Sequence, residues 1–374
     1  MSVKDPGYRQ CSVSVMDNIA DPGISFDEKG ICNYYYEYYQ AERSLVVKGE
    51  EGERQIKAII EQIKKDGKGK KYDCILGVSG GVDSSYLAWY AAQQGLRVLC
   101  VHFDNGWDSE LAVQNIENIV SKCGHDLYTY VINWEEFKDI QLSYFKANVI
   151  DIEAVTDIAI MAALDKICMQ QKIKNVIIGL NVATEITLPG AWICKNTSNL
   201  RDIHRQFGTL PLKTYPIMSP VRRRIIARTK PFKNWLFLNY LPYDKKKAKE
   251  IIKAELGWRD YGGKHYESVF TRFYQGYILP EKFKVDKRKA HLSNLIFSGQ
   301  MTKEEALEEL NKPIYPEDVF KTDYEFVLKK LGFTEEEFQN YLKAPAVPHD
   351  QFDMSLSIFD EIPSLKPFRR IFGK

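Results

Sequence analysis

A pair of glycines between an apolar run and a helical pattern constrains the fold of this chain more than any other feature. Residues 75–85 have the sequence ILGVSGGVDSS, in which a strand-like run, Tyr72–Val78, is followed by a helical pattern at Tyr86–Ala92. Adjacent glycines allow positive φ and a close approach of the backbone to a ligand. A glycine-rich turn from a strand into a helix N-terminus binds anions, because free N–H groups and the helix dipole point at the turn. The sequence therefore predicts an anion site, with Asp83 and Ser84 at the start of the helix.

Two common phosphate loops do not fit this segment. A Walker loop requires a lysine after its glycines, and a dinucleotide loop requires the spacing G-x-G-x-x-G. Ser-Gly-Gly-x-Asp-Ser instead resembles the pyrophosphate loop of enzymes that split ATP into AMP and pyrophosphate. The resemblance assigns ATP binding to Ser79, Gly80, Gly81, Val82, Asp83 and Ser84, and catalysis to Ser79, Asp83 and Ser84. The alternative is a glycine-rich turn without a ligand.

Composition limits the class of protein. The chain has 374 residues, which allows two or three domains, and its charge is nearly balanced at +2, so no global feature requires a nucleic-acid partner. No apolar run reaches the roughly 18 to 20 residues that span a bilayer. Seven cysteines, an odd number and scattered, favour a reducing compartment. We expect a cytoplasmic protein without a membrane span.

Short strand patterns alternate with helical patterns after the glycine loop. The strand patterns are Arg97–Phe103, Leu127–Ile132 and Asn175–Gly179, and helical patterns lie between them at Ser109–Cys123 and Val155–Gln170. Such alternation predicts βαβ units and a parallel sheet over roughly residues 70 to 220. The expected fold class is α/β.

Ligands of parallel sheets bind at the carboxyl ends of the strands, which selects further candidates. We expect nucleotide binding by polar residues after the second and fourth strands: His102, Asp104, Asn105, Gly179 and Asn181. The alternative for the polar ones is a turn residue or a helix cap, which is also the simplest role for Asp157. Mg²⁺ is expected with ATP because it neutralises charge that develops as pyrophosphate leaves. Its candidate ligands are Asp83 and Glu185.

The alternation stops beyond Pro220, and the rest of the chain has helical patterns. They lie at Lys245–Leu256, Lys264–Tyr277, Asp286–Ser298, Thr302–Asn311, Asp323–Leu331 and Thr334–Leu342. Two of them begin with capping boxes, Thr302 with Glu305 and Thr334 with Glu337. A basic run at 222–228 precedes them and favours a solvated or phosphate-facing stretch over a membrane or nucleic-acid contact.

Two basic stripes interleaved with aromatic residues fall within these helical patterns. His265, Ser268 and Arg272 have the spacing of one helix face, and the same spacing recurs in a second group, Lys284, Lys287, Arg288 and His291. Cations suit the phosphates of a sugar diphosphate and aromatic rings suit sugar or base faces. The alternative is two charged helix faces in solvent.

Long segments of the chain resemble the N-acetyl sugar amidotransferase family of bacterial surface-polysaccharide synthesis. The resemblance covers VMDNIADPGISFDEKGICN, SGGVDSS, RDIHRQFGT, GWRDYGGKHYESVFTRFYQGYILPEKF, DKRKAHLSNLIFSGQMT and KEEALEEL. It implies that ATP drives conversion of an acetamido group on a nucleotide-linked sugar, expected to be UDP-linked, into an acetamidino group. It also implies a separate glutaminase subunit that supplies ammonia. Sugar-nucleotide binding is assigned to Lys264, His265, Glu267, Arg272, Lys287, Arg288 and His291.

The start of the chain departs from the pattern of this family. The family often carries two Cys-x-x-Cys pairs, which suit a four-thiolate zinc site. Here the first pair is reduced to Cys11 with Ser14, and the second to Cys32 with Tyr35. Because serine and tyrosine are not usual zinc ligands, we expect Cys11 and Cys32 to be remnants and no zinc to bind.

These features predict three parts and leave two alternative functions. The parts are an N-terminal segment at 1–50, an ATP-binding α/β domain at 51–235 with a pyrophosphate loop, and a helical region at 236–374 that binds the sugar nucleotide. One alternative is a tRNA thiolase or lysidine-type ligase, which the near-neutral charge disfavours. The other is a non-catalytic nucleotide-binding scaffold, which the intact loop disfavours.

Overall fold

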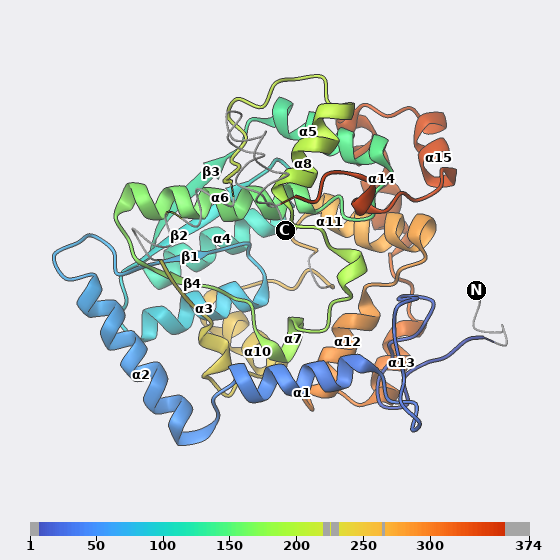
Figure 1. Cartoon of the computed structure of the whole chain (residues 1–374). Helices are drawn as coiled ribbons and strands as arrows, with labels where there is room; N and C mark the ends of the chain where they lie inside the picture. Colours follow the sequence, from blue (N-terminus) through green and yellow to red (C-terminus); the bar gives the residue numbers. More distant parts are fainter. Residues whose placement is uncertain (1–6, 220–224, 226–231, 264–265, 356–374) are drawn as a thin grey trace, which may run out of the picture.

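A computed structural model describes residues 7–219, 225, 232–263 and 266–355, and its centre is a parallel sheet (Figure 1). The strands are β1(Cys74–Gly77), β2(Val98–Asp104), β3(Asp126–Val131), β4(Asn175–Ile177) and β5(Lys233–Trp235), in the order β3-β2-β1-β4-β5. All four pairings are parallel. The predicted α/β class and its first four strands are confirmed. The sequence did not predict β5, which pairs with β4 after the alternation was expected to have stopped.

Both faces of the sheet are covered by helices. On β1, Leu76 belongs to a cluster shared with α2(Gly49–Asp66), α3(Val82–Gln93), α4(Glu110–Cys123) and α10(Lys245–Leu256). Its neighbour Ile75 belongs to the opposite cluster, which includes residues of α6(Ala154–Gln171). Successive strand residues point to opposite faces, so a continuous apolar run is what a strand covered on both sides requires.

The strand order reverses beside β1, and this reversal places the ligand crevice. From β1 the chain adds β2 and β3 on one side, and it then crosses back to add β4 and β5 on the other. Connections that leave β1 and β4 in opposite directions open a crevice outside their carboxyl ends. The glycine loop follows β1 and α7(Val182–Glu185) follows β4, so both border this crevice.

The C-terminal region is helical, as predicted. It contains α11(Val269–Phe273), the π-helix η3(Tyr274–Phe283), α12(Arg288–Phe297), α13(Lys303–Asn311), α14(Glu317–Leu331) and α15(Glu335–Lys343). Both predicted capping boxes are present, at the start of α13 and of α15. The remaining elements are α1(Asn33–Leu45), α5(Trp134–Ala147), α8(Thr197–Phe207), η1(Gly190–Trp192), η2(Phe237–Asn239) and η4(His349–Gln351).

The helix predicted over Lys264–Tyr277 begins later, at Val269, with Ser268 as its N-cap. The residues before Val269 instead pair with the loop after β2. Ser109 N donates to Glu267 O at 2.9 Å and Val269 N donates to Trp107 O at 2.8 Å. The bridge keeps the backbone before Val269 extended, so the predicted helix lacks its first turn, and Ser268 joins the helix as its cap, with Ser268 O accepting from Arg272 N at 3.0 Å. Lys264 and His265 lie outside the described residues, as does the basic run at 222–228 except for Ile225.

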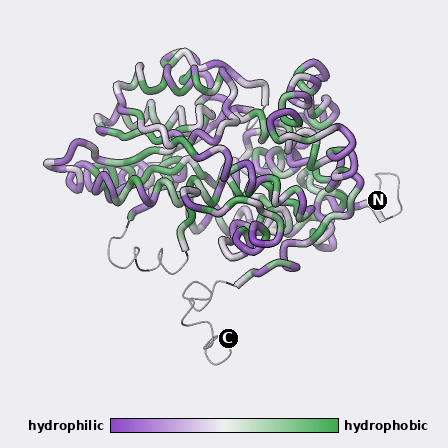
Figure 2. The backbone as a smooth tube through the Cα atoms, turned by 90° about the horizontal axis from the view of Figure 1, so that it is seen from above, coloured by the Kyte–Doolittle hydropathy of each residue, from purple (hydrophilic) through white to green (hydrophobic). Residues whose placement is uncertain are grey.

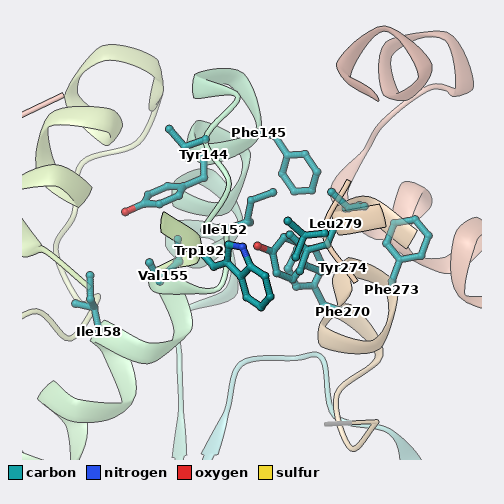
Figure 3. Packing of buried hydrophobic residues seen from close by; sticks show 14 of the residues in the cluster. Tyr144, Phe145, Ile152, Val155, Ile158, Trp192, Phe270, Phe273, Tyr274 and Leu279 are labelled. Atoms are coloured by element: carbon teal, nitrogen blue, oxygen red, sulfur yellow. The ribbon is translucent and has the colours of Figure 1, made fainter. Parts of the chain in front are cut away.

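The main hydrophobic core crosses all three predicted parts. It joins Cys11 and Tyr38 near the N-terminus to Phe145 of α5 and to Phe273 and Phe338 of the C-terminal region. Figure 3 shows the centre of this core, where Tyr144, Phe145, Ile152 and Trp192 pack against Phe270, Tyr274 and Leu279. Figure 2 shows apolar segments running through the middle of the molecule, with hydrophilic turns at its margin. The core does not divide at the boundaries of the three predicted parts. The three parts therefore stay a prediction about which segments bind which substrate.

Candidate active site

The glycine loop is held in shape by hydroxyl groups from its own sequence. Ser79 Oγ accepts from Gly81 N at 3.3 Å, and Ser85 Oγ donates to Gly81 O at 2.7 Å. Ser84 Oγ accepts from Ser79 N at 3.4 Å. Gly81 is the N-cap of α3, so the first turn of that helix, which contains Asp83, starts at the loop. The loop therefore presents a helix N-terminus to the crevice, which is the arrangement that binds anions.

Two aromatic side chains from the segment after α10 fix Gly80. Trp258 Nε1 donates to Gly80 O at 2.7 Å, and the Tyr261 hydroxyl donates to the same oxygen at 3.0 Å. Gly80 has a φ of +79°, and a Cβ atom there would lie 2.6 Å from the Tyr261 hydroxyl. Both the backbone conformation and the close contact require glycine at this position. Trp258 and Tyr261, the two clamps on Gly80, belong to the WRDYGG stretch that carries the family resemblance. Nothing in that stretch indicated a contact with the glycine loop.

The candidate magnesium ligands Asp83 and Glu185 lie near one tyrosine. The Tyr243 hydroxyl donates a hydrogen bond to Asp83 Oδ1. Burial raises the pKa of Tyr243, and the charges of Asp83 and Glu185, which both line the main cavity, raise it further. Mg²⁺ is usually bound by one or two protein carboxylates together with phosphate oxygens and water, and this pair fits that requirement. Tyr243 had no distinguishing signal in the sequence.

The predicted nucleotide residues separate into two groups. Ser79, Gly81, Val82, Asp83, Ser84 and Gly179 line the main cavity, whereas His102, Asp104, Asn105 and Asn181 are not among its lining residues. Asp104 Oδ1 accepts from Gly106 N at 2.8 Å, and Asn105 Oδ1 accepts from Trp107 N at 3.2 Å, so both stabilise the turn after β2. Asn181 caps α7. Gly80 is also not among the lining residues, and nucleotide binding by all of the predicted residues stays a prediction.

His102 supports the loop from behind. Its Nδ1 lies 3.2 Å from Val78 O and its Nε2 lies 3.0 Å from Asp108 Oδ2. Burial lowers the pKa of His102, but the hydrogen bond and charge of Asp108 outweigh burial, so the pKa lies above its usual value. A carbonyl and a carboxylate both accept hydrogen bonds, so the imidazolium form satisfies both contacts.

One cavity of about 1240 Å³ joins the glycine loop to the C-terminal helices. Residues of the loop and of the segment after β4 line one end, and Gln275 of η3 and His291 of α12 belong to the other. Of the predicted sugar-nucleotide residues that the structure describes, all line it: Glu267, Arg272, Lys287, Arg288 and His291. A volume above 1000 Å³ is large for a single small-molecule site and suits two substrates bound side by side.

Both arginines of the predicted stripes already have carboxylate partners. Arg272 donates to both oxygens of Asp323, at 2.6 and 2.9 Å, and the two side chains are only 15% and 7% exposed. Arg288 donates to Asp286 at 2.8 Å and also to Lys312 O at 2.9 Å. Phosphate binding by either guanidinium stays a prediction, but these contacts occupy several of its N–H donors.

Two further members of the second stripe line the cavity: Lys287, the N-cap of α12, and His291 in the first turn of that helix. Lys287 Nζ is 3.4 Å from Glu153 Oε2, a longer contact than those of the arginines. Gln275 Nε2 donates to the same Glu153 oxygen at 2.9 Å. Lys284 is separated from them because it ends η3 in the left-handed conformation.

Asp157, for which the sequence predicted a helix-cap role, pairs with Lys195 at 2.9 Å.

The two remaining cysteines of the N-terminal segment lie together in the core. Cys32 N donates to Cys11 Sγ at 3.3 Å, and Ser14 Oγ is 3.9 Å from Cys32 Sγ. The hydrogen bond from the Cys32 thiol lowers the pKa of Cys11. Among the described residues no group of three or more His, Cys, Asp or Glu side chains is arranged to hold a metal ion. The neighbouring tyrosines Tyr35 and Tyr38 pack on Phe297 of α12.

Comparison with known families identifies part of the chain. Residues 267–363 match the family model described as "LPS biosynthesis protein WbpG-like, C-terminal domain". The matched segment is about a quarter of the chain, begins at the bridge to the loop after β2, and contains η3 and α12. This match agrees with the resemblance to the N-acetyl sugar amidotransferase family. A comparison with curated proteins finds no match to the chain.

Two solved structures show a weak likeness. One is NMN synthetase from Francisella tularensis, at 16% identity and a TM-score of 0.29, covering 35% of this chain and 56% of that one. The other is NH₃-dependent NAD synthetase from Campylobacter jejuni, at 14% identity and a TM-score of 0.30, covering 55% and 83%. The match thus spans little more than half of the NMN synthetase chain. At such TM-scores neither structure supports a statement about the chemistry of this chain.

Among the described residues, no helix has both the length and the apolar character needed to cross a bilayer.

Proposed function

We propose that this protein is an ATP-dependent amidotransferase that converts an acetamido group of a nucleotide-linked sugar into an acetamidino group, for bacterial surface-polysaccharide synthesis. The observation that carries the proposal is the single cavity that links the glycine loop to a segment matching a lipopolysaccharide-biosynthesis family. ATP would bind at the loop and the sugar nucleotide at the C-terminal helices. The two substrates would meet between them.

The chemistry requires the two substrates to share one space. An amide carbonyl is a poor electrophile, and its oxygen is a poor leaving group. If the amide oxygen attacks the α-phosphorus of ATP, pyrophosphate departs and the oxygen carries AMP. Ammonia then attacks the carbon, AMP leaves, and an amidine remains. No protein nucleophile takes part, so the protein contributes mainly positioning and charge stabilisation.

The loop and the two carboxylates suit the first step. Backbone N–H groups of the loop and the N-terminus of α3 would hold the β- and γ-phosphates that leave as pyrophosphate. Asp83 and Glu185 would hold Mg²⁺, which when bound neutralises the charge that develops on the leaving phosphates. Tyr243 would keep Asp83 oriented through its hydrogen bond.

The sugar-nucleotide end of the cavity is proposed from charge and position. Lys287 and His291 both line the cavity, and Lys287 Nζ lies 3.4 Å from its carboxylate partner Glu153, so these two side chains would face the diphosphate. Arg272 and Arg288 would shape this end through Asp323 and Asp286. Ammonia is proposed to come from a separate glutaminase subunit.

The test is a product analysis with purified protein. It is incubated with ATP, Mg²⁺, ammonium and a panel of UDP-linked N-acetyl sugars, and products are measured by mass spectrometry and pyrophosphate release. We expect AMP, pyrophosphate and a sugar nucleotide in which one carbonyl oxygen is replaced by an imino group, in equal amounts. Stoichiometric ADP and phosphate would contradict the assignment of the loop. AMP formation that requires tRNA instead of a UDP-sugar would favour the tRNA-modifying alternative.

A further inference from the structure

The segment that connects the C-terminal region to the glycine loop carries a carboxylate at the junction of the two substrate ends. The antiparallel bridge between residues 107–109 and 267–269 fixes the backbone of Glu267 on both sides. Its side chain lies against the loop, because Glu267 Oε1 is 3.2 Å from the position that a Cβ atom on Gly81 would occupy. Ser79 Oγ is at the same distance from that position. Glu267 therefore lies beside the phosphate loop although it belongs to the C-terminal region.

Several other carboxylates that line the cavity have structural partners. They cap helices or pair with lysines on the cavity wall: Asp244 caps α10, Glu305 completes the capping box of α13, Asp260 pairs with Lys249 at 3.0 Å, and Glu309 pairs with Lys312 at 2.6 Å. Asp83 accepts a hydrogen bond from Tyr243, and the charges of Asp83 and Glu185 both act on that tyrosine. The position of Glu267, between the loop and the helices of the C-terminal region, distinguishes it from all of these.

The proposed reaction, on which this inference rests, creates a need for one proton acceptor. When ammonia attacks the activated carbon, a C–N bond forms and the new nitrogen carries three hydrogens and a positive charge. Expulsion of AMP from that species would leave a dication, with a positive charge on each of the two nitrogens bonded to the amidine carbon. If one proton first leaves the new nitrogen, the C–O bond breaks with its electron pair going to AMP, and the product is a singly charged amidinium. One proton must therefore be accepted at this place.

We propose that the Glu267 carboxylate accepts that proton and is a catalytic residue of the ammonia step. The proton passes from the new nitrogen to Glu267 as AMP leaves, and then to solvent. Negative charge on bound phosphates nearby disfavours the ionised form of a carboxyl group, which makes the carboxylate a stronger base near neutral pH. Adenylation of the amide needs no such acceptor, so the role is limited to the second step.

The test separates the two steps in the full-length protein. Exchange of labelled pyrophosphate into ATP, dependent on the UDP-sugar, reports adenylation, and mass spectrometry of the amidine reports the ammonia step. In Glu267→Gln we expect exchange near the wild-type rate and amidine formation lowered about 10²- to 10⁴-fold, the range for loss of a general base. Glu267→Asp should recover part of the rate. Glu281→Gln, an exposed residue of η3, is the matched control and should behave as wild type.

Hydroxylamine in place of ammonia provides a readout that a structural role would not change. Its adduct loses a proton more readily because the attached oxygen withdraws electrons, so the deficit of Glu267→Gln should shrink with hydroxylamine. Equal loss of exchange and amidine formation in this variant would overturn the inference, as would amidine formation at the wild-type rate. If wild-type protein shows no exchange with any UDP-sugar, the proposed function itself fails, and the inference fails with it.

Discussion

The two ends of the cavity bring positive potential to a ligand in different ways. At the loop it comes from backbone N–H groups and a helix N-terminus, and the surrounding side chains hold the backbone in shape. At the C-terminal end it comes from side-chain cations, and Arg272 and Arg288 already pair with carboxylates. A cation in a sequence is therefore a weaker indicator of a phosphate site than a glycine turn. Backbone donors at a helix N-terminus have no intrahelical partner, whereas an arginine in a protein interior needs one.

The largest effect is expected at the loop. Asp83→Asn removes one charge from the proposed metal site but keeps the size of the side chain. We expect AMP formation to fall about 10²- to 10³-fold, the range for losing one preorganised electrostatic group, while binding of the UDP-sugar stays as in wild type. Turnover and calorimetric titration measure the two quantities. Equal loss of ATP turnover and sugar binding would show that the two ends are not separate.

At the opposite end, Arg272→Ala should change stability. It leaves Asp323 buried with its charge no longer matched, and breaking a buried ion pair from one side costs about 3 kcal/mol or more. Urea unfolding measures this loss in the free energy of unfolding. Lys48→Ala, which breaks the exposed pair with Glu42, is the control and should cost less than about 1 kcal/mol. If Arg272→Ala is as stable as wild type but binds the UDP-sugar ten- to a hundredfold more weakly, the guanidinium is a phosphate ligand.

A smaller effect is expected from the side chain that orients Asp83. Tyr243→Phe deletes one hydrogen bond to a carboxylate, which should lower AMP formation by about tenfold and raise the Mg²⁺ concentration needed for half-maximal rate. Tyr90→Phe is the matched control, because Tyr90 lies on α3, the helix that carries Asp83, and its ring packs against Phe237 of η2. If Tyr243→Phe needs the same Mg²⁺ concentration as wild type, Tyr243 does not orient Asp83 for metal binding.

The smallest effect concerns the support behind the loop and depends on pH. The pKa of His102 is higher in the folded chain than its usual value, so its imidazolium stabilises the fold fully below about pH 6.5. That contribution is lost as pH rises through the folded pKa. The melting temperature of wild type should therefore fall more between pH 6 and pH 8 than that of His102→Gln. Parallel pH profiles for both proteins would contradict the assigned contacts with Val78 and Asp108.

Local patterns in the sequence predicted the loop end well. The strand, the glycine pair and the helix are contiguous, so their geometry follows from residues 72 to 92 alone, and the capping boxes of α13 and α15 are equally local. The strand β5 was missed because it has only three residues, Lys233–Trp235, with no apolar alternation. The partners of the cations were missed because they are distant in sequence, as Asp323 is from Arg272.

The bridge at residues 267–269 explains the main error at the other end. The helical pattern in the sequence continues back to residue 264, but tertiary pairing with the loop after β2 delays the start of α11 to Val269. That pairing depends on backbone groups, which carry no side-chain pattern to detect. The clamps on Gly80 and the hydrogen bond of Tyr243 likewise arise from contacts more than 150 residues apart.

The core that joins the first forty residues to the C-terminal helices has a consequence for synthesis of the chain. Tyr38 of α1 packs on Phe297 of α12, so its apolar surface lacks this native partner until residue 297 has left the ribosome. Contacts this distant in sequence slow folding and leave the emerging N-terminal segment exposed to aggregation. A chain truncated before α12 will therefore lose packing of its first helix as well as its last ones, and limited proteolysis of such a fragment should cut first within α1.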